Sequence, residues 1–476
     1  MNFHTNIISF KALAAAIFAA ASLTAQALPT FVDNSKQIYF PPIIDQKGGS
    51  CAQASGIGYM FTYEMNRLLG RNASASEANQ FAYLFTWNFV NGGGDNGGFV
   101  DEGLMIARNF GVMTEADYGY ASVYQFKWAS GYEKYHNAAR YRVRRITKFD
   151  DTTDEGIAKI KQYLYDRGDG SSAGGVLTFS TESSNWKIDN NYSGPSLTGY
   201  KSILTKLATD GSHAITIAGY DDTVESTDAD GNKHSGAFIV VNTWGTWWSD
   251  NGRFYLPYYF FTERKYLDGS YLSTDMQGCD VYYHEPKVMY KIRLNYSSRD
   301  DLRLTFGAAT SPYAQSALNN YNSIIVYEQG GDYPMTGSFG SENKGVLEFG
   351  IDYSDKMRSD DEQNGRYFLN VVRSQRGKTF GEGTIDYLSV IDYRGEKPVE
   401  YVCRGIGGRS LRLGSNSFSV STLHAGHFSA SPSSALTTAG SVSGKTFLVR
   451  TAGGRVAKLK FYGSRENLGF NYTFLK

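Results

Sequence analysis

Cys51 stands at a position where a cysteine can act as a nucleophile. It follows a glycine-rich turn and opens the run Cys51–Leu69, whose spacing predicts a helix that ends at Gly70. Because the N–H groups at a helix N-terminus stabilise a thiolate, we expect the pKa of this thiol to be lowered. Gln46 could donate its side-chain amide, together with the Cys51 N–H, to an oxyanion on an attacked carbonyl. On this segment alone, a small buried cysteine beside a solvent-facing glutamine explains the sequence equally well.

Two strand-like segments carry groups that could activate this thiol. His213 begins the apolar run HAITIA, and Asn242 directly follows the run AFIVV. A base beside a thiol needs a third group to orient it, and an amide oxygen can fix which ring nitrogen faces the sulfur. Trp244 could exclude water from that contact. Each residue alone is more often structural, but with Cys51 they supply a nucleophile, a base and an orienting group.

The elements around these residues predict an α+β domain. Helical spacing continues at Glu77–Phe89 and Glu102–Asn109, and strand-like runs follow at Gly175–Phe179, His213–Ala218 and Ala237–Val241. From Val288 the pattern changes to short alternating strands separated by turn residues, which predicts an all-β sandwich over 288–428. Residues 429–444 read as a linker or exposed loop, and residues 445–476 as a β-hairpin or meander.

The first 27 residues have the composition of a signal peptide. Lys11 precedes the apolar run Ala12–Ala21, and Ala25–Ala27 supplies small residues for cleavage. We therefore expect export from a bacterial cell, to the periplasm or the medium, with an uncleaved anchor as the lesser alternative. The chain of 476 residues has 47 Lys+Arg and 47 Asp+Glu, which gives no electrostatic support for binding nucleic acid or an anionic membrane.

Four segments, in order along the chain, resemble the signature blocks of papain-like (C1 family) cysteine peptidases. They are the Gln-to-Cys segment 46–51, Asn96–Phe99 with Gly111–Tyr120, Gly211–Tyr220, and Ala237–Gly252. The resemblance implies a two-lobed α+β peptidase domain over 28–287, with no metal and no organic cofactor. The part from 288 onward more faintly resembles the jelly-roll modules that are attached to secreted proteases.

The resemblance also implies roles for individual residues. Cys51 becomes the nucleophile, His213 the proton carrier, Asn242 the orienting amide and Gln46 the oxyanion donor. Trp244 would shield the contact between His213 and Asn242, and Trp248 matches a second signature tryptophan. The segment expected to bind substrate is Gly97, Gly98 and Phe99: the Gly98 backbone would pair with an extended peptide, and Phe99 would lie at a pocket wall. An ordinary turn remains the alternative for the two glycines.

Several positions depart from the family pattern. Ala52 replaces the usual tryptophan after the nucleophile, and the loop from Gln46 to Cys51 is one residue short. Asp95 stands where the family has a disulfide cysteine, and its partner cysteine is missing too. Cys279 and Cys403 could then form a bridge between the two domains, which sequence spacing cannot decide.

Two further segments bear on latency and on calcium. Only Leu28–Ser50 separates the expected cleavage site from Cys51, so there is no room for a long N-terminal prosegment, and any inhibitor or pro-region partner is unidentified. The insertion Asp221–Gly236 carries alternating Asp and Asn residues, but its glycine spacing favours a hairpin turn over a calcium loop.

We therefore expect an exported cysteine peptidase, a papain-like endopeptidase acting on proteins or peptides. Two alternatives stay open. One is a catalytically silent binding or adhesion protein on a peptidase scaffold. The other is a thiol acyl-transfer enzyme that acts on cell-wall peptides. The mature protein is not expected to bind a membrane.

Overall fold

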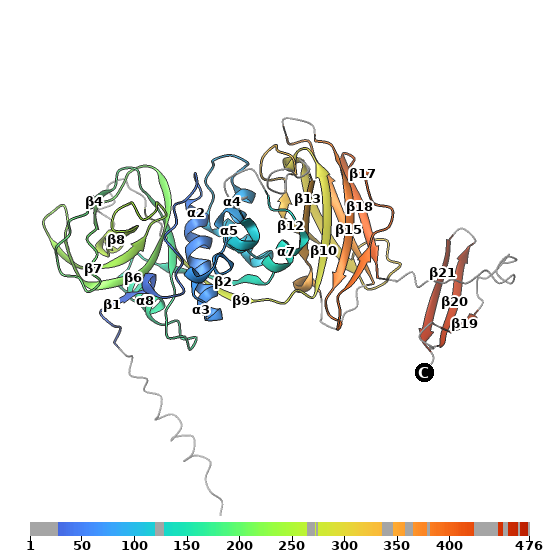
Figure 1. Cartoon of the computed structure of the whole chain (residues 1–476), viewed down its shortest axis with the longest axis horizontal. Helices are drawn as coiled ribbons and strands as arrows, with labels where there is room; N and C mark the ends of the chain where they lie inside the picture. Colours follow the sequence, from blue (N-terminus) through green and yellow to red (C-terminus); the bar gives the residue numbers. More distant parts are fainter. Residues whose placement is uncertain are drawn as a thin grey trace, which may run out of the picture. The chain divides into compact units, whose positions relative to one another are not determined.

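The computed structural model describes residues 27–119, 128–263, 272, 275–335, 346–357, 365–377 and 381–422, together with three strands within 446–474 (Figure 1). The chain divides into two compact units, Met1–Thr422 and Leu423–Lys476. The expected signal peptide, except for Ala27, and the expected linker 429–444 lie outside the described residues. None of the described helices is long and apolar enough to cross a membrane.

The helix predicted at Cys51–Leu69 is present and forms the centre of the first unit. It consists of three consecutive segments, α2 (Cys51–Gln53), the π-helical η2 (Ala54–Phe61) and α3 (Thr62–Leu69), and it ends at Gly70 in the left-handed conformation. Its first 16 residues are almost all buried, so it is enclosed rather than amphipathic. Small residues permit this: a Cβ at Gly58 would lie 2.5 Å from Ile44.

Further helical segments precede and follow this central helix along the chain. They are η1 (Asn34–Lys36), η3 (Ala73–Ala75), η4 (Glu77–Asn79), α4 (Tyr83–Val90), α5 (Val100–Asn109), α6 (Glu115–Tyr118), α7 (Tyr132–Ala138), α8 (Asp154–Tyr165) and α9 (Tyr259–Thr262). Of these, α4 and α5 pack against the central helix. The prediction of one helix over 77–89 is confirmed from Tyr83 on and is wrong before it. There the chain turns once and then extends, and Phe81 forms an isolated β-bridge with Thr114.

A nine-stranded sheet makes up most of the remaining α+β part. Its strands are β1 (Phe31–Asp33), β2 (Tyr141–Asp150), β3 (Leu177–Glu182), β4 (Lys187–Asp189), β5 (Ile203–Lys206), β6 (Ser212–Thr227), β7 (Lys233–Val241), β8 (Arg253–Pro257) and β9 (Asp275–Tyr283). The order is β2-β9-β3-β6-β7-β8-β5-β4, with β1 on β6, and only the β5–β8 pair is parallel. The insertion between β6 and β7 is the predicted hairpin, in which the Asp228 carboxylate accepts the backbone N–H groups of Asp230 and Asn232.

Residues 288–422, the two-sheet region, form two antiparallel sheets. One has the order β13-β10-β15-β16, with β17 on β15, and the other has the order β12-β11-β14-β18. The strands are β10 (Val288–Tyr296), β11 (Leu302–Ala309), β12 (Asn319–Tyr327), β13 (Val346–Asp352), β14 (Arg366–Arg373), β15 (Gly383–Asp392), β16 (Val399–Val402), β17 (Arg409–Ser410) and β18 (Gly414–Ser421), with short turns η7 (Arg299–Asp301) and η8 (Ser354–Lys356).

The two sheets share one apolar core. Tyr290 of β10 donates its hydroxyl to the Gly307 carbonyl of β11 and packs edge-on against Tyr367 of β14. From Tyr290 on, alternate residues of β10 are buried, as the alternating pattern predicts for a half-buried strand. The jelly-roll assignment for this region stays a prediction.

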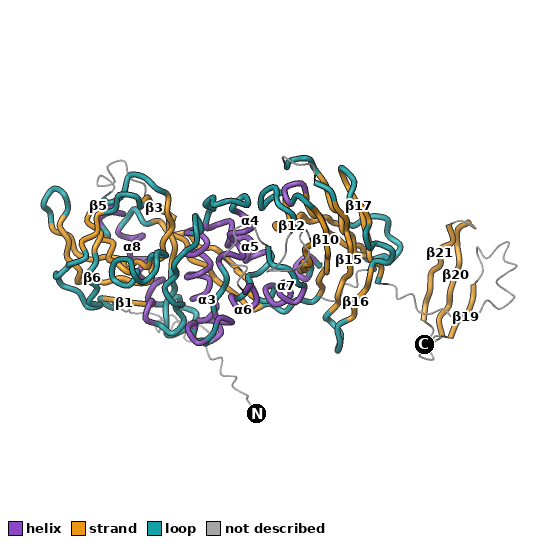
Figure 2. Tube along the Cα trace, turned by 45° about the horizontal axis from the view of Figure 1, so that its top comes forward, coloured by secondary structure: helices purple, strands orange, loops and turns teal. Residues whose placement is uncertain are grey.

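The two-sheet region packs directly against the helices of the α+β part. Figure 2 shows α4, α5 and α7 between strands β3, β5 and β6 on one side and the two-sheet region on the other. Arg142 of β2 and His284 both contact the buried carboxylate of Asp352 in β13, at 2.6 and 2.7 Å. The guanidinium of Arg299 lies 4.5 Å from the ring of Trp128. These contacts make residues up to Thr422 one unit, and the expected boundary at 287 falls between β9 and β10.

The second unit is a small antiparallel sheet. Its strands β19 (Thr446–Arg450), β20 (Val456–Ser464) and β21 (Asn467–Phe474) pair in chain order, which is the order of a meander.

Candidate active site

The Cys51 thiol lies at the first residue of α2 and is partly buried. Burial raises its pKa, while the backbone N–H groups of Ala214, Ala52 and Cys51 itself act in the opposite direction. The prediction of a lowered pKa is therefore wrong in its net direction, because desolvation outweighs the helix N-terminus. The contact with the Ala214 N–H brings the sulfur to β6, directly beside His213.

His213 and Asn242 form the contact that the sequence predicts. The ring Nε2 of His213 lies 2.7 Å from the Asn242 Oδ1, and the same oxygen accepts the Thr243 N–H at 2.8 Å. The Asn242 Oδ1 is an acceptor in both contacts, so the ring nitrogen that faces it must be the donor. We therefore assign the ring hydrogen to Nε2. The His213 Nδ1 is then left unprotonated. Neighbouring strands position the pair, since His213 lies near the start of β6 and Asn242 directly follows β7.

Aromatic rings enclose the His213 imidazole. Trp244 stacks on it with ring centroids 4.7 Å apart and an interplanar angle of 24°. Trp248 meets Trp244 edge-on at 5.3 Å, and Trp186 lies 5.9 Å from His213. This burial lowers the pKa of His213 to about 4, against the opposing effect of the hydrogen bond to Asn242. The imidazole is therefore neutral at pH 7.

Trp186 was missed by the sequence analysis. It lies between β3 and β4, outside every signature segment, and it contacts Trp244, Trp248 and Phe254 as well as His213. Only its residue type hinted at a role, because these contacts join segments far apart in the sequence.

Gln46 is held on the Asn242 side of Cys51. Its backbone N–H donates to the Thr243 carbonyl at 2.8 Å, and its side-chain oxygen accepts the Thr243 hydroxyl. The side-chain Nε2 donates to the Gly48 carbonyl at 2.7 Å. One of the two N–H groups of this amide is thus used within the loop.

Gly97–Phe99 lies on the other side of the helix N-terminus. A Cβ at Gly49 would be 3.2 Å from the Gly97 nitrogen, so this strand-like segment runs close beside the turn before Cys51. A Cβ at Gly97 would lie 3.8 Å from the Gly49 carbonyl oxygen, an ordinary contact, whereas a Cβ at Gly98 would lie 2.9 Å from Val90. Packing against α4 is therefore a second reason for glycine at position 98. Phe99 is 77% exposed, as a residue at a binding surface can be.

Gln53 ties the nucleophile's helix to this segment and was also missed. Its buried side chain donates Nε2 to the Phe99 carbonyl at 2.8 Å and accepts the Thr86 hydroxyl at 2.9 Å. The Phe99 N–H donates to the Glu102 carboxylate at 2.8 Å. These bonds hold the Phe99 backbone at both its polar groups, which leaves the orientation of the segment little freedom.

The expected bridge between Cys279 and Cys403 is absent, and both thiols are free. Cys279 is completely buried in β9, inside the nine-stranded sheet. Cys403 follows β16 in the two-sheet region, where its N–H donates to the Leu388 carbonyl. Each cysteine therefore belongs to a separate sheet, and burial raises the pKa of both thiols.

One group among the described residues brings potential metal ligands together. Ligand atoms of His284, Asp352 and Asp355 lie within 4.8 Å of one another. However, Asp352 already accepts hydrogen bonds from Arg142 and His284 on one oxygen and from Ser354 on the other. The Arg142 guanidinium already balances the charge of Asp352, so we interpret this cluster as an ion-pair contact between the nine-stranded sheet and the two-sheet region.

Comparison with known proteins identifies the family. A family model described as "Papain family cysteine protease" matches residues 28–260. Among solved structures, xylellain, a cysteine protease from Xylella fastidiosa, is 17% identical with a TM-score of 0.36, covering 53% of this chain and 86% of that one. The bromelain protease from Ananas comosus, solved with the E64 inhibitor, is 15% identical with a TM-score of 0.34, covering 53% and 99%. A search of curated proteins found no match.

The matched residues contain Cys51, His213, Asn242 and Gln46. Over residues 28–260, this chain therefore belongs to the papain family of cysteine proteases and is a cysteine-type peptidase.

Proposed function

We propose that this peptidase cleaves peptide bonds of proteins or peptides with Cys51 as its nucleophile, and that it works after export. The observation that carries the proposal is the 2.7 Å contact between His213 and Asn242, beneath Trp244 and beside the residue that donates to the Cys51 sulfur. A nucleophile, a base and a group that orients the base then meet at one helix N-terminus.

The resting pair is neutral in this proposal. Burial raises the pKa of the Cys51 thiol and lowers that of His213, so the proton stays on sulfur until a substrate binds. His213 Nδ1 then takes the thiol proton as the sulfur attacks the substrate carbonyl carbon. Asn242 holds the ring in the orientation that this transfer needs, and it accepts the Nε2 hydrogen throughout.

The negative charge that forms on the substrate oxygen needs donors. The second N–H of the Gln46 amide and the Cys51 backbone N–H supply them in this mechanism. When the C–N bond breaks, His213 returns its proton to the leaving amine and a thioester remains on Cys51. His213 then deprotonates a water molecule that hydrolyses the thioester, and the thiol is regenerated.

The substrate is placed by Gly97–Phe99. The position of Gly97 beside the turn before Cys51 and the exposed ring of Phe99 support a main-chain pairing with an extended peptide. We propose endopeptidase activity with it, because main-chain pairing on a segment as exposed as Phe99 lets a long chain extend past the site.

Export is proposed from the residues before Leu28. Their charged start, apolar run and small-residue cleavage site support removal of a signal peptide, with the enzyme then acting in the periplasm or the medium.

A peptide-library digest tests the proposal. We expect the wild type to cleave library peptides and Cys51→Ala to leave them intact. Cys403→Ala is the matched control, because it removes a free, partly exposed thiol from the two-sheet region and should cleave as the wild type does. A catalytically silent binding protein would give the same product pattern with and without the Cys51 thiol, and this result would contradict the proposal. Cleavage of muropeptides in place of the library would indicate a cell-wall enzyme.

A further inference from the structure

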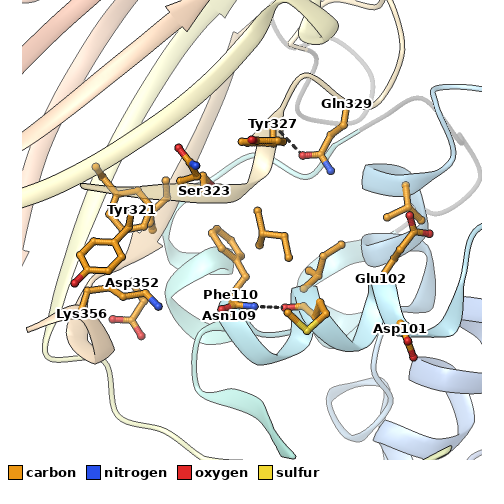
Figure 3. Close-up of a pocket in the computed structure, with 17 residues that line it drawn as sticks. Asp101, Glu102, Asn109, Phe110, Tyr321, Ser323, Tyr327, Gln329, Asp352 and Lys356 are labelled. Carbon is orange, nitrogen blue, oxygen red and sulfur yellow. Dashed lines mark hydrogen bonds between the residues drawn. The ribbon is translucent and has the colours of Figure 1, made fainter. Parts of the chain in front are cut away.

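A cavity of about 610 Å³ lies between α5 and β12 (Figure 3). The α5 side contributes Met105, Ile106 and Phe110, and β12 contributes Tyr321 and Ile324. The cavity is therefore walled by the peptidase part on one side and by the two-sheet region on the other. Its lining is mainly apolar, and its volume is in the range of sites that bind ligands.

The cavity continues from the segment that we propose as the substrate-binding strand. Glu102 lines the cavity, and its carboxylate accepts the Phe99 N–H at 2.8 Å. Val90 also lines it and lies under Gly98, where a Cβ would be 2.9 Å away. A peptide that passes Gly97–Phe99 thus reaches the near end of the cavity within one turn of α5.

β12 presents an open strand edge to this cavity. In the described part of its sheet, β12 is the end strand and pairs only with β11. The consecutive residues Tyr321–Ile324 all line the cavity; Tyr321 and Asn322 are in register with β11, and beyond Asn322 the strand bulges before pairing again at Tyr327. An open edge of this kind can take an extended peptide as an additional strand.

The charges along the cavity differ from end to end. Asp101 and Glu102 lie near Phe99, and the partner of Asp101 is Lys148 at 3.9 Å. At the other end, Asp352 is neutralised by Arg142, and Lys356 lies 5.4 Å from the ring centroid of Tyr321. The end near Phe99 is acidic, the middle is apolar, and the far end has no uncompensated acidic group among these residues.

We propose that this cavity binds the part of a peptide substrate that lies upstream of the residues at Gly97–Phe99, which deepens the proposed function and depends on it. The peptide adds to the β12 edge, a basic side chain faces Asp101 and Glu102, and an apolar side chain packs on Met105 and Phe110. The ten residues of α5 span roughly 15 Å, which an extended peptide covers in about five residues. Substrates with about seven or more residues before the scissile bond should therefore be preferred.

The test uses the full chain and two peptides with the same cleavage site. The short peptide has two residues before the scissile bond, and the long one has eight, with a lysine followed upstream by leucines. In Met105→Glu, kcat/KM for the long peptide should fall about tenfold, the loss expected when one apolar side chain loses its contact, and that for the short peptide should not change. Leu68→Glu, at an exposed leucine of α3 outside the cavity, is the matched control.

Tyr327→Ser changes the opposite wall of the cavity and should lower kcat/KM for the long peptide selectively, as Met105→Glu does. Because Tyr327 lies in β12, this variant shows whether the effect of Met105→Glu arises only from misfolding of α5. An unchanged ratio of long-peptide to short-peptide kcat/KM in both variants would overturn the proposal. A gain of activity on the short peptide would overturn it too, because it would mean that a segment of this chain occupies the cavity. If the wild type cleaves neither peptide, the proposed function itself fails, independently of the cavity.

Discussion

The Asp95 carboxylate accepts the Gly49 N–H at 2.7 Å and so connects the loop before Gly97 to the turn before Cys51. The family resemblance places a disulfide cysteine at position 95, where this chain has the aspartate. A hydrogen bond therefore spans the place of a covalent link. A side chain at Gly48 is also excluded, because its Cβ would overlap Asp95 and its φ is +55°.

Removing this connection should weaken substrate binding. In Asp95→Ala, the turn before Cys51 loses a hydrogen bond worth about 1 kcal/mol, so we expect a several-fold rise in KM with a smaller change in kcat. Steady-state kinetics on one peptide measures this. Asp189→Ala, which removes a similar bond to a backbone N–H in a distant turn, is the control and should leave both constants unchanged.

Asn242 is expected to act through His213. In Asn242→Ala the imidazole loses the acceptor at its Nε2, so its orientation and its favoured tautomer are no longer set. We expect kcat to fall roughly tenfold to a hundredfold, at or below the low end of what a positioned acid–base group contributes, because the imidazole itself remains. Asn242→Gln, which keeps an amide, should recover part of the loss. Equal kcat values in the wild type and Asn242→Ala would show that the contact has no catalytic role.

The buried His213 should make stability depend on pH. Its folded pKa is about 4, below the usual value near 6.5, so between these values the unfolded chain binds a proton that the folded chain does not. The free energy of unfolding is therefore unaffected by His213 above pH 6.5 and decreases as the pH falls towards 4, by about 3 kcal/mol in total. Urea unfolding at pH 7 and pH 4 should show this loss in the wild type and not in His213→Gln. The same pH dependence in both would contradict the assignment.

Trp186 should control the proton affinity of His213. In Trp186→Ala, water reaches the imidazole, so its pKa should rise from about 4 towards its usual value. The pH dependence of Cys51 alkylation by iodoacetamide, or the imidazole NMR shift, measures this change. Trp87→Ala, at a buried tryptophan of α4 that donates to the Asn96 carbonyl, is the control for lost packing and should leave the His213 pKa unchanged.

The ion pair between Arg142 and Asp352 should anchor the two-sheet region. Arg142→Met leaves the buried Asp352 carboxylate without its guanidinium partner, and we expect a loss of about 3–5 kcal/mol in the free energy of unfolding. Arg145→Met, which removes the exposed partner of Asp280, should cost less than about 1 kcal/mol. Denaturant unfolding of both variants gives the comparison, and similar losses in both would contradict this role.

The local features of the site were readable from the sequence. The helix that begins at Cys51 follows from its glycine-rich entry and from Gly70 at its end, and the contact between His213 and Asn242 follows from the motifs that carry them. The alternating apolar and polar residues after Val288 predicted an all-β region and several of its strands, whereas the pairing order of the strands was not predictable, since pairing joins distant segments.

What failed depends on tertiary burial. The pKa of Cys51 is raised because surrounding segments desolvate it, which the helix position alone does not reveal. Trp186 and Gln53 act through contacts with residues far along the chain, so no local pattern marks them. The expected bridge from Cys279 to Cys403 failed because cysteine counting carries no distance.

Labelling of Cys51 by an epoxide probe at neutral pH tests most directly whether the thiol and the imidazole work together. We expect rapid labelling of Cys51 in the wild type and in the control Cys403→Ala. In His213→Ala the labelling rate should fall at least tenfold. Mass spectrometry locates the modified residue. Labelling of Cys51 at the same rate with and without the His213 imidazole would contradict the central claim that this histidine activates the sulfur.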